Sequence, residues 1–490
     1  MRVLGLCSYP KEAAATRFRI VQFVGPLSVR GIDVSVRPFF DRDQFAAMYS
    51  GRTSVGKVFS ILRSVLERIS GVFELGKYDL IFVQREAMIF GPPIFEWLYR
   101  RIANIPMVLD LDDATYVPYV SPSYGRLGSY LKFFGKTDRL IRAASVVVCG
   151  NRFIAEYVEG KGSKAVVIPT IVDPNVFVPV EKDNSVPVIG WIGTHSTFPF
   201  LESLFPVLTR LAASHKFVLK IVGAGIDKVN IDGVDVINLP WDADREIADF
   251  QSMDIGVYPI VISKSANEEW IKGKSGFKAI QYMAVGVPFV MSPVGVCAEI
   301  GMPGKTHFNA VNQEDWYNPL SKLLSGSELR IRMGNAGRCL FEQDYCIEKF
   351  VDTLAETFRV ICRLCVHSDE FRPPRITRFP NSTRSVKSIL WDAPIILPSP
   401  SINVGSTSLT TSGSGIELIS FKRNISQYRP RRISSPPRKI FRCPIRVCSP
   451  IERRFVPIKT LKCPIETSSP ISQSVASMID RPIRTRFPIL

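Results

Sequence analysis

Lysines and a glycine cluster where one helix, residues 275–285, is expected to begin. Lys272 and Lys274 precede the helix, and Gly276 and Lys278 lie in its first turn. The first N–H groups of a helix have no acceptor within the helix, and the helix dipole is positive there. This combination favours a phosphate-bearing ligand. The alternative interpretation is a solvated lysine face on an ordinary loop–helix–strand unit.

The spacing of apolar residues predicts that helix and the strand after it. Three- and four-residue spacing is typical of a helix face that packs on a core. The residues with this spacing are Phe277, Ile280, Met283 and Ala284. Gly286 is expected to end the helix, and residues 287–291 are expected to form a short buried strand.

Three aspartates follow each other at the end of another expected strand, residues 106–111. They are Asp110, Asp112 and Asp113. Carboxylates this close repel each other unless a cation or hydroxyl groups neutralise them. They are interpreted either as a cap of the next helix or as a substrate-binding or catalytic group. No histidine lies nearby, so no metal site is expected, although the carboxylates leave a bound divalent ion open.

Two arginines, Arg17 and Arg19, follow the loop after the first expected strand, residues 3–7. A helix is expected over residues 17–30 and a second strand over 33–37. Loops at the carboxyl ends of parallel strands bind ligands in open α/β folds. The two arginines are therefore candidates for an acceptor or anion site, and the alternative is a solvated helix face.

Strands and helices alternate along the chain, which predicts an α/β fold with parallel sheets. The expected domains are an N-terminal Rossmann-like unit (1–170, the first unit), a linker (171–187) and a C-terminal Rossmann-like unit (188–345, the second unit). A closing helix (346–362) and an Arg/Pro/Ser-rich tail (363–490) follow. Two such units are expected to face a cleft.

The charge of the chain is concentrated in the tail. The net charge is +17 over 490 residues, but residues 371–490 contain 21 Lys and Arg against 5 Asp and Glu. The body is therefore close to neutral, and no nucleic acid is expected to bind residues 1–362. The tail also holds 16 of the 36 prolines. It is predicted to be disordered, either as a basic arm or as the product of a reading-frame shift.

The remaining features concern location. The ten cysteines are scattered, no signal peptide is evident, and no run of eighteen apolar residues exists, so a cytoplasmic protein is expected. Residues 51–75 predict a long amphipathic helix with an apolar stripe. Packing on a sheet is one interpretation of this helix, and peripheral contact with an anionic membrane is the other. Another basic helix is expected over residues 124–144.

Three segments resemble family 4 glycosyltransferases, which have the GT-B fold of two Rossmann domains. The segment FKAIQYMAVGVPFVMSPVG resembles the family's EAMA-x-G-x-PVV block. VVVCGNRFIAEYV with VIPTIVDPNVF resembles the end of its first domain, and MDIGVYPI resembles its ADI-x-V-x-P strand. The resemblance covers roughly residues 1–362. It implies a retaining transferase that uses a nucleotide-diphospho-sugar as co-substrate, without a further cofactor or a metal.

The resemblance also implies roles for individual residues. Asp112 and Asp113, in a DxDDA-type block, and Lys278 are implied to be catalytic. In place of the family's two glutamates this chain has Gly273 and Gln281. The family's Arg and Lys that hold the diphosphate are also missing after the expected strand at 188–192, so Lys274 and Lys278 are expected to neutralise the diphosphate instead. The implied donor-binding residues are Gly193, Thr194, His195, Gly223, Pro240, Trp241, Lys274, Gly276 and Gln281.

The function expected from these features is transfer of a sugar to a hydroxyl acceptor, on a glycan or a lipid-linked molecule, in the synthesis of a cell-surface glycan or polysaccharide. Two other functions remain open. One is a non-catalytic relative that binds nucleotide sugars, and the other is a Rossmann enzyme such as a nucleotide-sugar epimerase.

Overall fold

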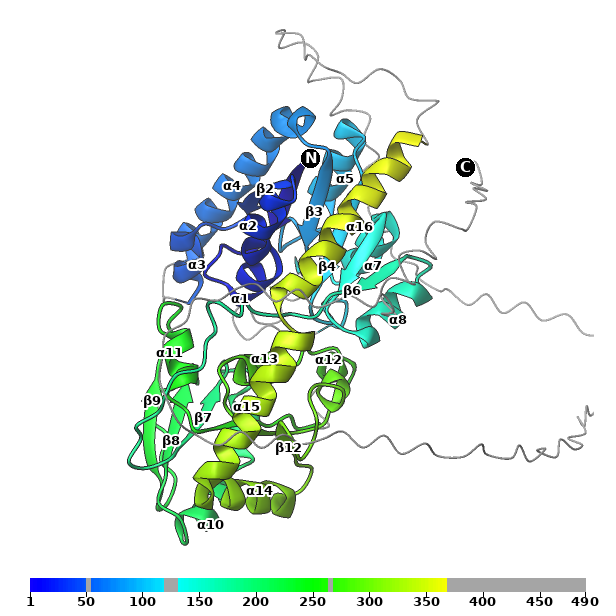
Figure 1. The fold of residues 1–490 in the computed structure, drawn as a ribbon. Coiled ribbons are helices and arrows are strands. Elements are labelled where there is room, and N and C mark those ends of the chain that lie inside the picture. The colour runs from blue at the N-terminus through cyan, green and yellow to red at the C-terminus, as the bar shows by residue number, and fades with distance from the viewer. Residues whose placement is uncertain (50–53, 119–130, 263–267, 368–490) are drawn as a thin grey trace, which may run out of the picture. The chain divides into compact units, whose positions relative to one another are not determined.

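Two parallel sheets organise the chain in this computed structural model, which describes residues 1–49, 54–118, 131–262 and 268–367. The first unit has the strand order β2-β1-β3-β4-β5-β6 (Figure 1). Its strands are β1 (Arg2–Cys7), β2 (Asp33–Pro38), β3 (Leu80–Gln84), β4 (Met107–Leu111), β5 (Val146–Cys149) and β6 (Ala165–Val167). Strands β1, β3, β4 and β5 are apolar over most of their length because helices cover both faces of a parallel sheet.

The second unit repeats this architecture with the strand order β12-β11-β10-β7-β8-β9. Its strands are β7 (Val188–Ile192), β8 (Val218–Val222), β9 (Asp235–Leu239), β10 (Ile255–Tyr258), β11 (Phe289–Met291) and β12 (His307–Asn309). Strand order reverses between β7 and β10, as it does between β1 and β3 in the first unit. The α/β fold with two Rossmann-like units predicted from the alternation of elements is confirmed.

Helices flank both sheets. Those of the first unit are α1 (Ala14–Thr16), the π-helix η1 (Arg17–Val21), α2 (Gln22–Val29), α3 (Arg42–Tyr49), α4 (Ser54–Ser70), the 3₁₀-helix η2 (Gly71–Lys77), α5 (Ile94–Ala103), α7 (Lys136–Ala143) and α8 (Arg152–Gly160). Those after it are α9 (Phe198–Glu202), α10 (Phe205–Ala212), α11 (Glu246–Gln251), α12 (Glu268–Lys272), α13 (Phe277–Ala284), η3 (Gly295–Ala298), α14 (Gln313–Ser325), α15 (Ser327–Asp344) and α16 (Ile347–His367).

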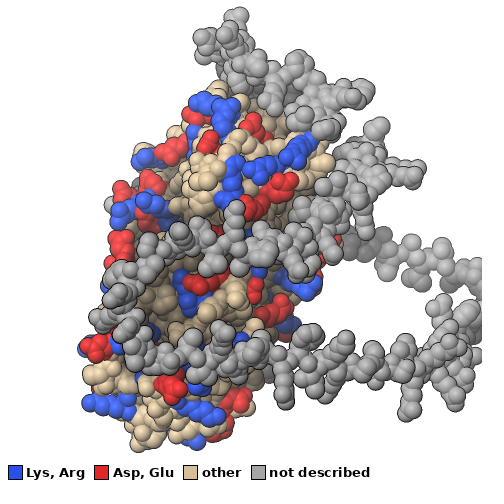
Figure 2. All heavy atoms as spheres, viewed as in Figure 1, with Lys and Arg blue, Asp and Glu red and all other residues tan. Residues whose placement is uncertain are grey.

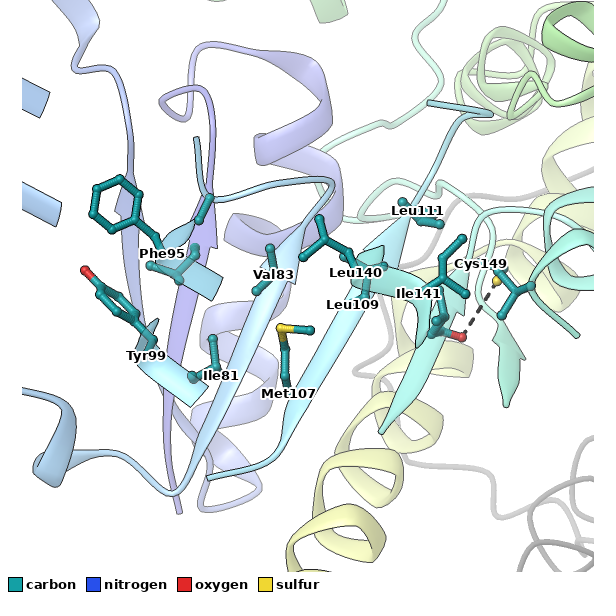
Figure 3. Packing of buried hydrophobic residues seen from close by; sticks show 14 of the residues in the cluster. Ile81, Val83, Phe95, Tyr99, Met107, Leu109, Leu111, Leu140, Ile141 and Cys149 are labelled. Atoms are coloured by element: carbon teal, nitrogen blue, oxygen red, sulfur yellow. Dashed lines mark hydrogen bonds between the residues drawn. The ribbon is translucent and has the colours of Figure 1, made fainter. Parts of the chain in front are cut away.

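The core of the first unit lies between β3, β4 and β5 and the helices beside them. Figure 3 shows Ile81, Val83, Met107 and Leu109 on adjacent strands, with Leu140 of α7 packed beside them. All five side chains are buried. Because one face of three neighbouring strands is filled in this way, the carboxyl ends of these strands are held in a fixed relation.

Tyr282 fixes α13 on the second sheet. Its hydroxyl donates to the carbonyl oxygens of Gly190 in β7 and Val257 in β10, at 3.0 and 3.3 Å. A Cβ atom at Gly256 would lie 2.5 Å from the Tyr282 ring, so only glycine leaves room for it. Arg338 of α15 donates to the carbonyl oxygen of Ala284, the last residue of α13, which satisfies an acceptor that the helix leaves open. The helix expected to bind phosphate is therefore anchored through its C-terminal turn.

The last helix, α16, packs against the first unit. Phe358 is fully buried, and its ring lies 5.1 Å from that of Phe82 in β3. The Arg359 guanidinium donates to the backbone oxygen of Arg30 at 2.8 Å. The closing helix expected at residues 346–362 thus exists, and it ties the end of the described chain to the first unit.

The structure differs from the prediction in several places. Residues 268–272, expected in a loop, form α12, and strand β12 was not predicted. The helix expected over residues 124–144 is interrupted, because Phe133 has a left-handed φ of 55° and α7 begins only at Lys136. Residues 124–130 of that prediction lie outside the described residues.

Charge is distributed evenly over the body. Figure 2 shows basic and acidic side chains interspersed on the visible face, which agrees with the near-neutral sequence of this part. The described residues belong to one compact unit, Met1–Phe379. The sequence predicts a disordered tail over residues 363–490. From residue 368 onward this tail lies outside the described residues. Of the helices described, none is both long and apolar enough to cross a membrane.

The position of Phe358 generates a stability prediction. We expect Phe358→Ala to lower the free energy of unfolding by about 3–5 kcal/mol, because it leaves a cavity between α16 and β3. Thermal melting followed by circular dichroism measures the change. Leu364→Ala, on the exposed side of the same helix, is the control and is expected to melt nearly as wild type does. Equal melting of both variants would contradict the packing role of Phe358.

Candidate active site at the carboxyl ends of the two sheets

The candidate residues follow the carboxyl ends of strands in both sheets. Asp112 and Asp113 follow β4, and Gly193 follows β7. Lys278 and Gln281 lie on α13, between β10 and β11. In open α/β sheets ligands bind at this edge, where strand order reverses. The contacts below show that the two edges meet.

The π-helix η1 sends its two arginines in different directions. Residues two apart on a helix do not share a face, so Arg17 and Arg19 point away from each other. Arg19 is buried, with both Asp110 oxygens within 3.1 Å of its Nε, and its Nη1 donates to the Ile168 carbonyl at 2.6 Å. The solvated-face interpretation was therefore wrong for Arg19. π-Helical turns are frequent at functional sites.

Arg85 neutralises the other two aspartates. Its Nε and Nη2 donate to the two carboxylate oxygens of Asp112 at 2.6 and 2.7 Å, and Nη2 also donates to Asp113 at 3.0 Å. Gln84 contributes a bond to Asp112 at 3.3 Å. Arg85 has a left-handed φ of 61°, an unfavourable conformation for this residue type. Backbone strain of this kind gathers at functional sites.

The two neighbouring carboxylates have opposite pKa shifts. Burial acts to raise the pKa of Asp112, but the Arg85 guanidinium outweighs it and the net pKa lies below the ordinary value. Burial and the charge of Asp112 raise the pKa of Asp113, with Arg85 and Lys274 opposing. About a third of the Asp113 side chain is exposed. Asp112 is thus held ionised by Arg85, and Asp113 is the more easily protonated carboxylate of the two.

Asp113 reaches the loop before α13. The Lys274 ammonium and the backbone N–H of Ser275 both act on the Asp113 carboxylate and lower its pKa, against the larger effect of burial. The Lys274 Nζ also lies 3.5 Å from the centroid of the Trp270 ring. Burial lowers the pKa of Lys274, and Asp113 counteracts this. The Asp113 carboxylate of the first unit therefore lies near the start of α13, where the sequence predicted an anionic ligand.

The same loop is held by backbone contacts. The Asn151 amide donates to the carbonyl oxygens of Gly273 and Lys274, both at 3.2 Å, while its oxygen caps α8. A Cβ atom at Gly273 would lie 2.3 Å from that of Ala114. Glycine at this position therefore lets the loop approach the aspartate block closely.

Glu246 is the centre of a second network. It forms an ion pair with Arg17 and accepts a hydrogen bond from the Gln281 amide at 3.1 Å. The Gln281 oxygen in turn accepts from the Lys278 ammonium at 3.3 Å. Burial lowers the pKa of Lys278, Glu246 opposes this, and the positive charge of Arg17 adds to it. Two cations from the two units thus share one buried carboxylate.

The glycine loops after β7 and β8 pack on each other. Gly223 has a φ of 82°, and a Cβ atom there would lie 2.4 Å from the backbone oxygen of Gly193 and 3.2 Å from the Trp241 side chain. His195 lies against the neighbouring Gly225. The Arg17 guanidinium lies 5.7 Å from the Trp241 ring centroid, so this cluster borders the Glu246 network.

The structure thus brings most predicted site residues into three adjoining groups. The aspartate group holds Asp112, Asp113 and Lys274, and the Glu246 group holds Arg17, Lys278 and Gln281. The glycine group holds Gly193, His195, Gly223 and Trp241. Gly276 begins α13 with a φ of 64°. Thr194 and Pro240 are exposed on their loops, and Arg19 and Asp110 form a buried pair.

Arg85, Asn151 and Glu246 were not predicted from the sequence. Arg85 is the first residue after β3 and Asn151 the second after β5, near the carboxyl ends of strands as the aspartates are near that of β4, and this shared position was the available signal. Glu246 begins a short helix and has no such signal. In the part of the chain that the structure describes, no three His, Cys, Asp or Glu side chains are grouped to hold a metal ion.

The Arg19–Asp110 pair generates a prediction about stability. We expect Asp110→Asn to destabilise the protein by about 3–5 kcal/mol, because it leaves the Arg19 charge buried without a counter-charge. Chemical denaturation measures the loss. The double variant Arg19→Met with Asp110→Leu is expected to recover most of it. If instead Asp110→Asn is as stable as wild type, the pair is not a structural one.

No protein-family model matches the chain, and no curated protein matches it in sequence. Among solved structures, sucrose-phosphate synthase from Thermosynechococcus elongatus is similar over 74% of this chain and 100% of its own, at 14% identity and a TM-score of 0.54. A glycosyltransferase from Rickettsia africae covers 74% of this chain and 98% of its own, with 14% identity and a TM-score of 0.51.

Anabaena HepE, whose structure holds UDP-glucose, covers 74% of this chain and 100% of its own, with 15% identity and a TM-score of 0.51. Identities this low show the fold alone. The fold that this chain shares with these proteins is GT-B, with two Rossmann-like units.

Proposed function

We propose that this chain is a glycosyltransferase that moves a sugar from a nucleotide-diphospho-sugar to a hydroxyl acceptor with retention of configuration. The observation that carries the proposal is the Glu246 group, in which Arg17 and Lys278 share one carboxylate beside the start of α13. Two cations with one counter-charge in a buried place favour an anionic ligand. The fold shared with HepE, which holds UDP-glucose, supports the same donor class.

In this mechanism the acceptor oxygen bonds to the anomeric carbon of the donor sugar while the bond from that carbon to the diphosphate breaks. The leaving nucleoside diphosphate gains negative charge, which Lys278 and Arg17 neutralise. The acceptor hydroxyl releases its proton, and Asp113 accepts or orients it. The proposed mechanism uses no metal or further cofactor. The glycine group, which includes Trp241, holds the nucleotide.

The missing family glutamates point to the alternative, a relative that binds nucleotide sugars without turnover. Gln281 supplies no charge, and both ends of its amide are engaged within the protein. Glu246, however, supplies a carboxylate directly beside the Gln281 amide. Gln281 then serves to position Lys278 and Glu246. The acceptor is proposed to be a glycan or a lipid-linked molecule in cell-surface glycan or polysaccharide synthesis.

The role of Lys278 tests the proposal. A thermal-shift screen with UDP-, GDP- and ADP-sugars first identifies the donor, since a ligand that binds the folded state raises the melting temperature. Turnover of that donor is then measured. We expect Lys278→Ala to lower kcat about 10²-fold, because the charge acts on the leaving diphosphate.

Lys349→Ala is the matched control, because Lys349, in the first turn of α16, is partly exposed and pairs with Asp344. It is expected to retain full activity. Wild-type turnover in Lys278→Ala would exclude the diphosphate assignment. Tight donor binding without turnover on any acceptor would favour the non-catalytic alternative.

The two aspartates are expected to differ in their pH dependence. Asp113 accepts a proton only when ionised, and its pKa is raised, so activity should fall on the acid side at a higher pH than for an ordinary aspartate. Asp113→Asn should lower kcat about 10²-fold and remove this acid limb. Asp112→Asn should move the limb to lower pH, because a neighbouring negative charge is lost.

Profiles of kcat against pH measure both effects. Asp138→Asn is the control, since Asp138 pairs with Lys161 and Tyr157 away from the three groups. An unchanged profile in both Asp112→Asn and Asp113→Asn would remove the aspartates from the site.

A further inference from the structure

The turn after β5 lies between the aspartate block and the loop before α13. On one side, a Cβ atom at Gly150 would lie 2.6 Å from the backbone oxygen of Asp112. On the other side, the Asn151 amide donates to the carbonyl oxygens of Gly273 and Lys274, both at 3.2 Å. Two consecutive residues of the first unit therefore contact the backbone of both segments.

The two ends of the Asn151 amide have separate tasks. The side chain is buried, and its oxygen accepts from the backbone N–H of Ile154 at 2.9 Å, which caps α8. A helix cap needs only this oxygen, and a serine hydroxyl supplies one as well. The amide nitrogen is not used by the cap. Its two hydrogen bonds therefore serve the contact with the loop of the second unit.

Lys274 is held at its backbone and along its side chain. Asn151 binds its carbonyl oxygen, and its ammonium lies 3.5 Å from the centroid of the Trp270 ring. Trp270 in turn packs against the cores of both units. Because a lysine side chain is long and flexible, its charge stays beside one partner only where the backbone and the stem are fixed. These contacts thus direct the ammonium at Asp113, on which it acts.

The charges around Asp113 come from three parts of the fold. Asp112 precedes it, Arg85 follows β3 and donates to it at 3.0 Å, and Lys274 lies before α13. Burial raises the pKa of Asp113 and the charge of Asp112 adds to this, whereas Arg85 and Lys274 lower it. Among these charges Lys274 alone belongs to the second unit.

Two further titratable groups face the pair and are neutral. Tyr258, at the end of β10, faces Asp113, and burial raises the pKa of its phenol. Cys297 of η3 faces Lys274, and burial raises the pKa of its thiol to about 12. Neither group replaces the positive charge of Lys274. A displacement of the loop away from the aspartate block would therefore raise the pKa of Asp113.

We propose that Asn151 is a positioning residue that keeps the Lys274 ammonium against Asp113, by holding the carbonyl oxygens of residues 273 and 274. Through this contact the second unit helps to keep a carboxylate of the first unit ionised. The use of that carboxylate as a proton acceptor rests on the proposed function, whereas the position of the ammonium does not.

Titration of the Asp113 carboxyl group in the full chain tests this role. ¹³C NMR of protein labelled at the aspartate carboxyl carbons follows it, and the signal missing from Asp113→Asn identifies it. In Asn151→Ser the hydroxyl still caps α8 but is too short to hold the loop, so Asp113 should titrate at higher pH than in wild type. Lys274→Met should shift the titration in the same direction. Because Asn151 acts through Lys274, the double variant should shift it no further than Lys274→Met does.

Asn312→Ser is the matched control, because Asn312 caps α14 in the same way, accepting from the Asp315 N–H at 3.0 Å. It is expected to leave the titration of Asp113 unchanged. The proposal is overturned if Asn151→Ser titrates as wild type does, or if its shift and that of Lys274→Met add in the double variant.

Profiles of kcat against pH separate this proposal from the proposed function. The acid limb should move to higher pH in Asn151→Ser, because Asp113 must be ionised to accept a proton. A shifted titration with an unmoved limb would support the positioning by Asn151 and count against Asp113 as the proton acceptor.

A second variant covers the case in which Asn151→Ser does not fold. Gly273→Ala adds a Cβ atom that would lie 2.3 Å from that of Ala114, so it displaces the loop while Asn151 is intact. Asp113 should again titrate at higher pH. Gly135→Ala, where an added Cβ atom meets nothing within 4 Å, is the control. An unchanged titration in Gly273→Ala would show that the position of the loop does not control Asp113, and would contradict the proposal.

Discussion

A buried charge needs a counter-charge, and this constraint determines how the two sheets meet. Asp110, Asp112 and Glu246 are all buried, and each is paired with an arginine that lies far from it in the sequence. Leaving any of them unpaired would cost several kcal/mol. The loops after β1, β3 and β4 must therefore lie where these pairs form. The Arg17–Glu246 pair extends the same requirement from the first unit to the second.

The parts of the fold that the sequence predicts are those encoded by local patterns. Strands β1 and β4 were predicted to within one residue of their observed bounds, because an apolar run between polar loops has one interpretation in an α/β chain. Strand β12 contains His307 and Asn309 and has only three residues, so it carries no such pattern. The stripe predicted on residues 51–75 combined two faces of α4, since the sequence does not show that Arg68 points inward.

The site is predictable only to the extent that single residues reveal their neighbours. The aspartate block and the lysines could be identified in the sequence because like charges in a short segment repel each other unless a partner or ligand neutralises them. Arg85 and Glu246 are isolated charges in ordinary contexts, and their importance arises from partners 27 and 35 residues away in the chain. Gln281 illustrates the same limit. In the sequence, the amide of Gln281 suggests that the site has lost a carboxylate. In the structure, Glu246 of α11 supplies a carboxylate next to that amide.

The position of Asp113 bears on where a donor diphosphate would lie. The start of α13 attracts negative charge, and the Asp113 carboxylate of the first unit already interacts there with Lys274 and the Ser275 N–H. One cation and one carboxylate balance there. Around Glu246, by contrast, Arg17 and Lys278 outnumber the carboxylate, and their mutual repulsion helps to lower the pKa of Lys278. A diphosphate relieves that repulsion, so it gains most on the Lys278 side of α13, with the acceptor on the Asp113 side.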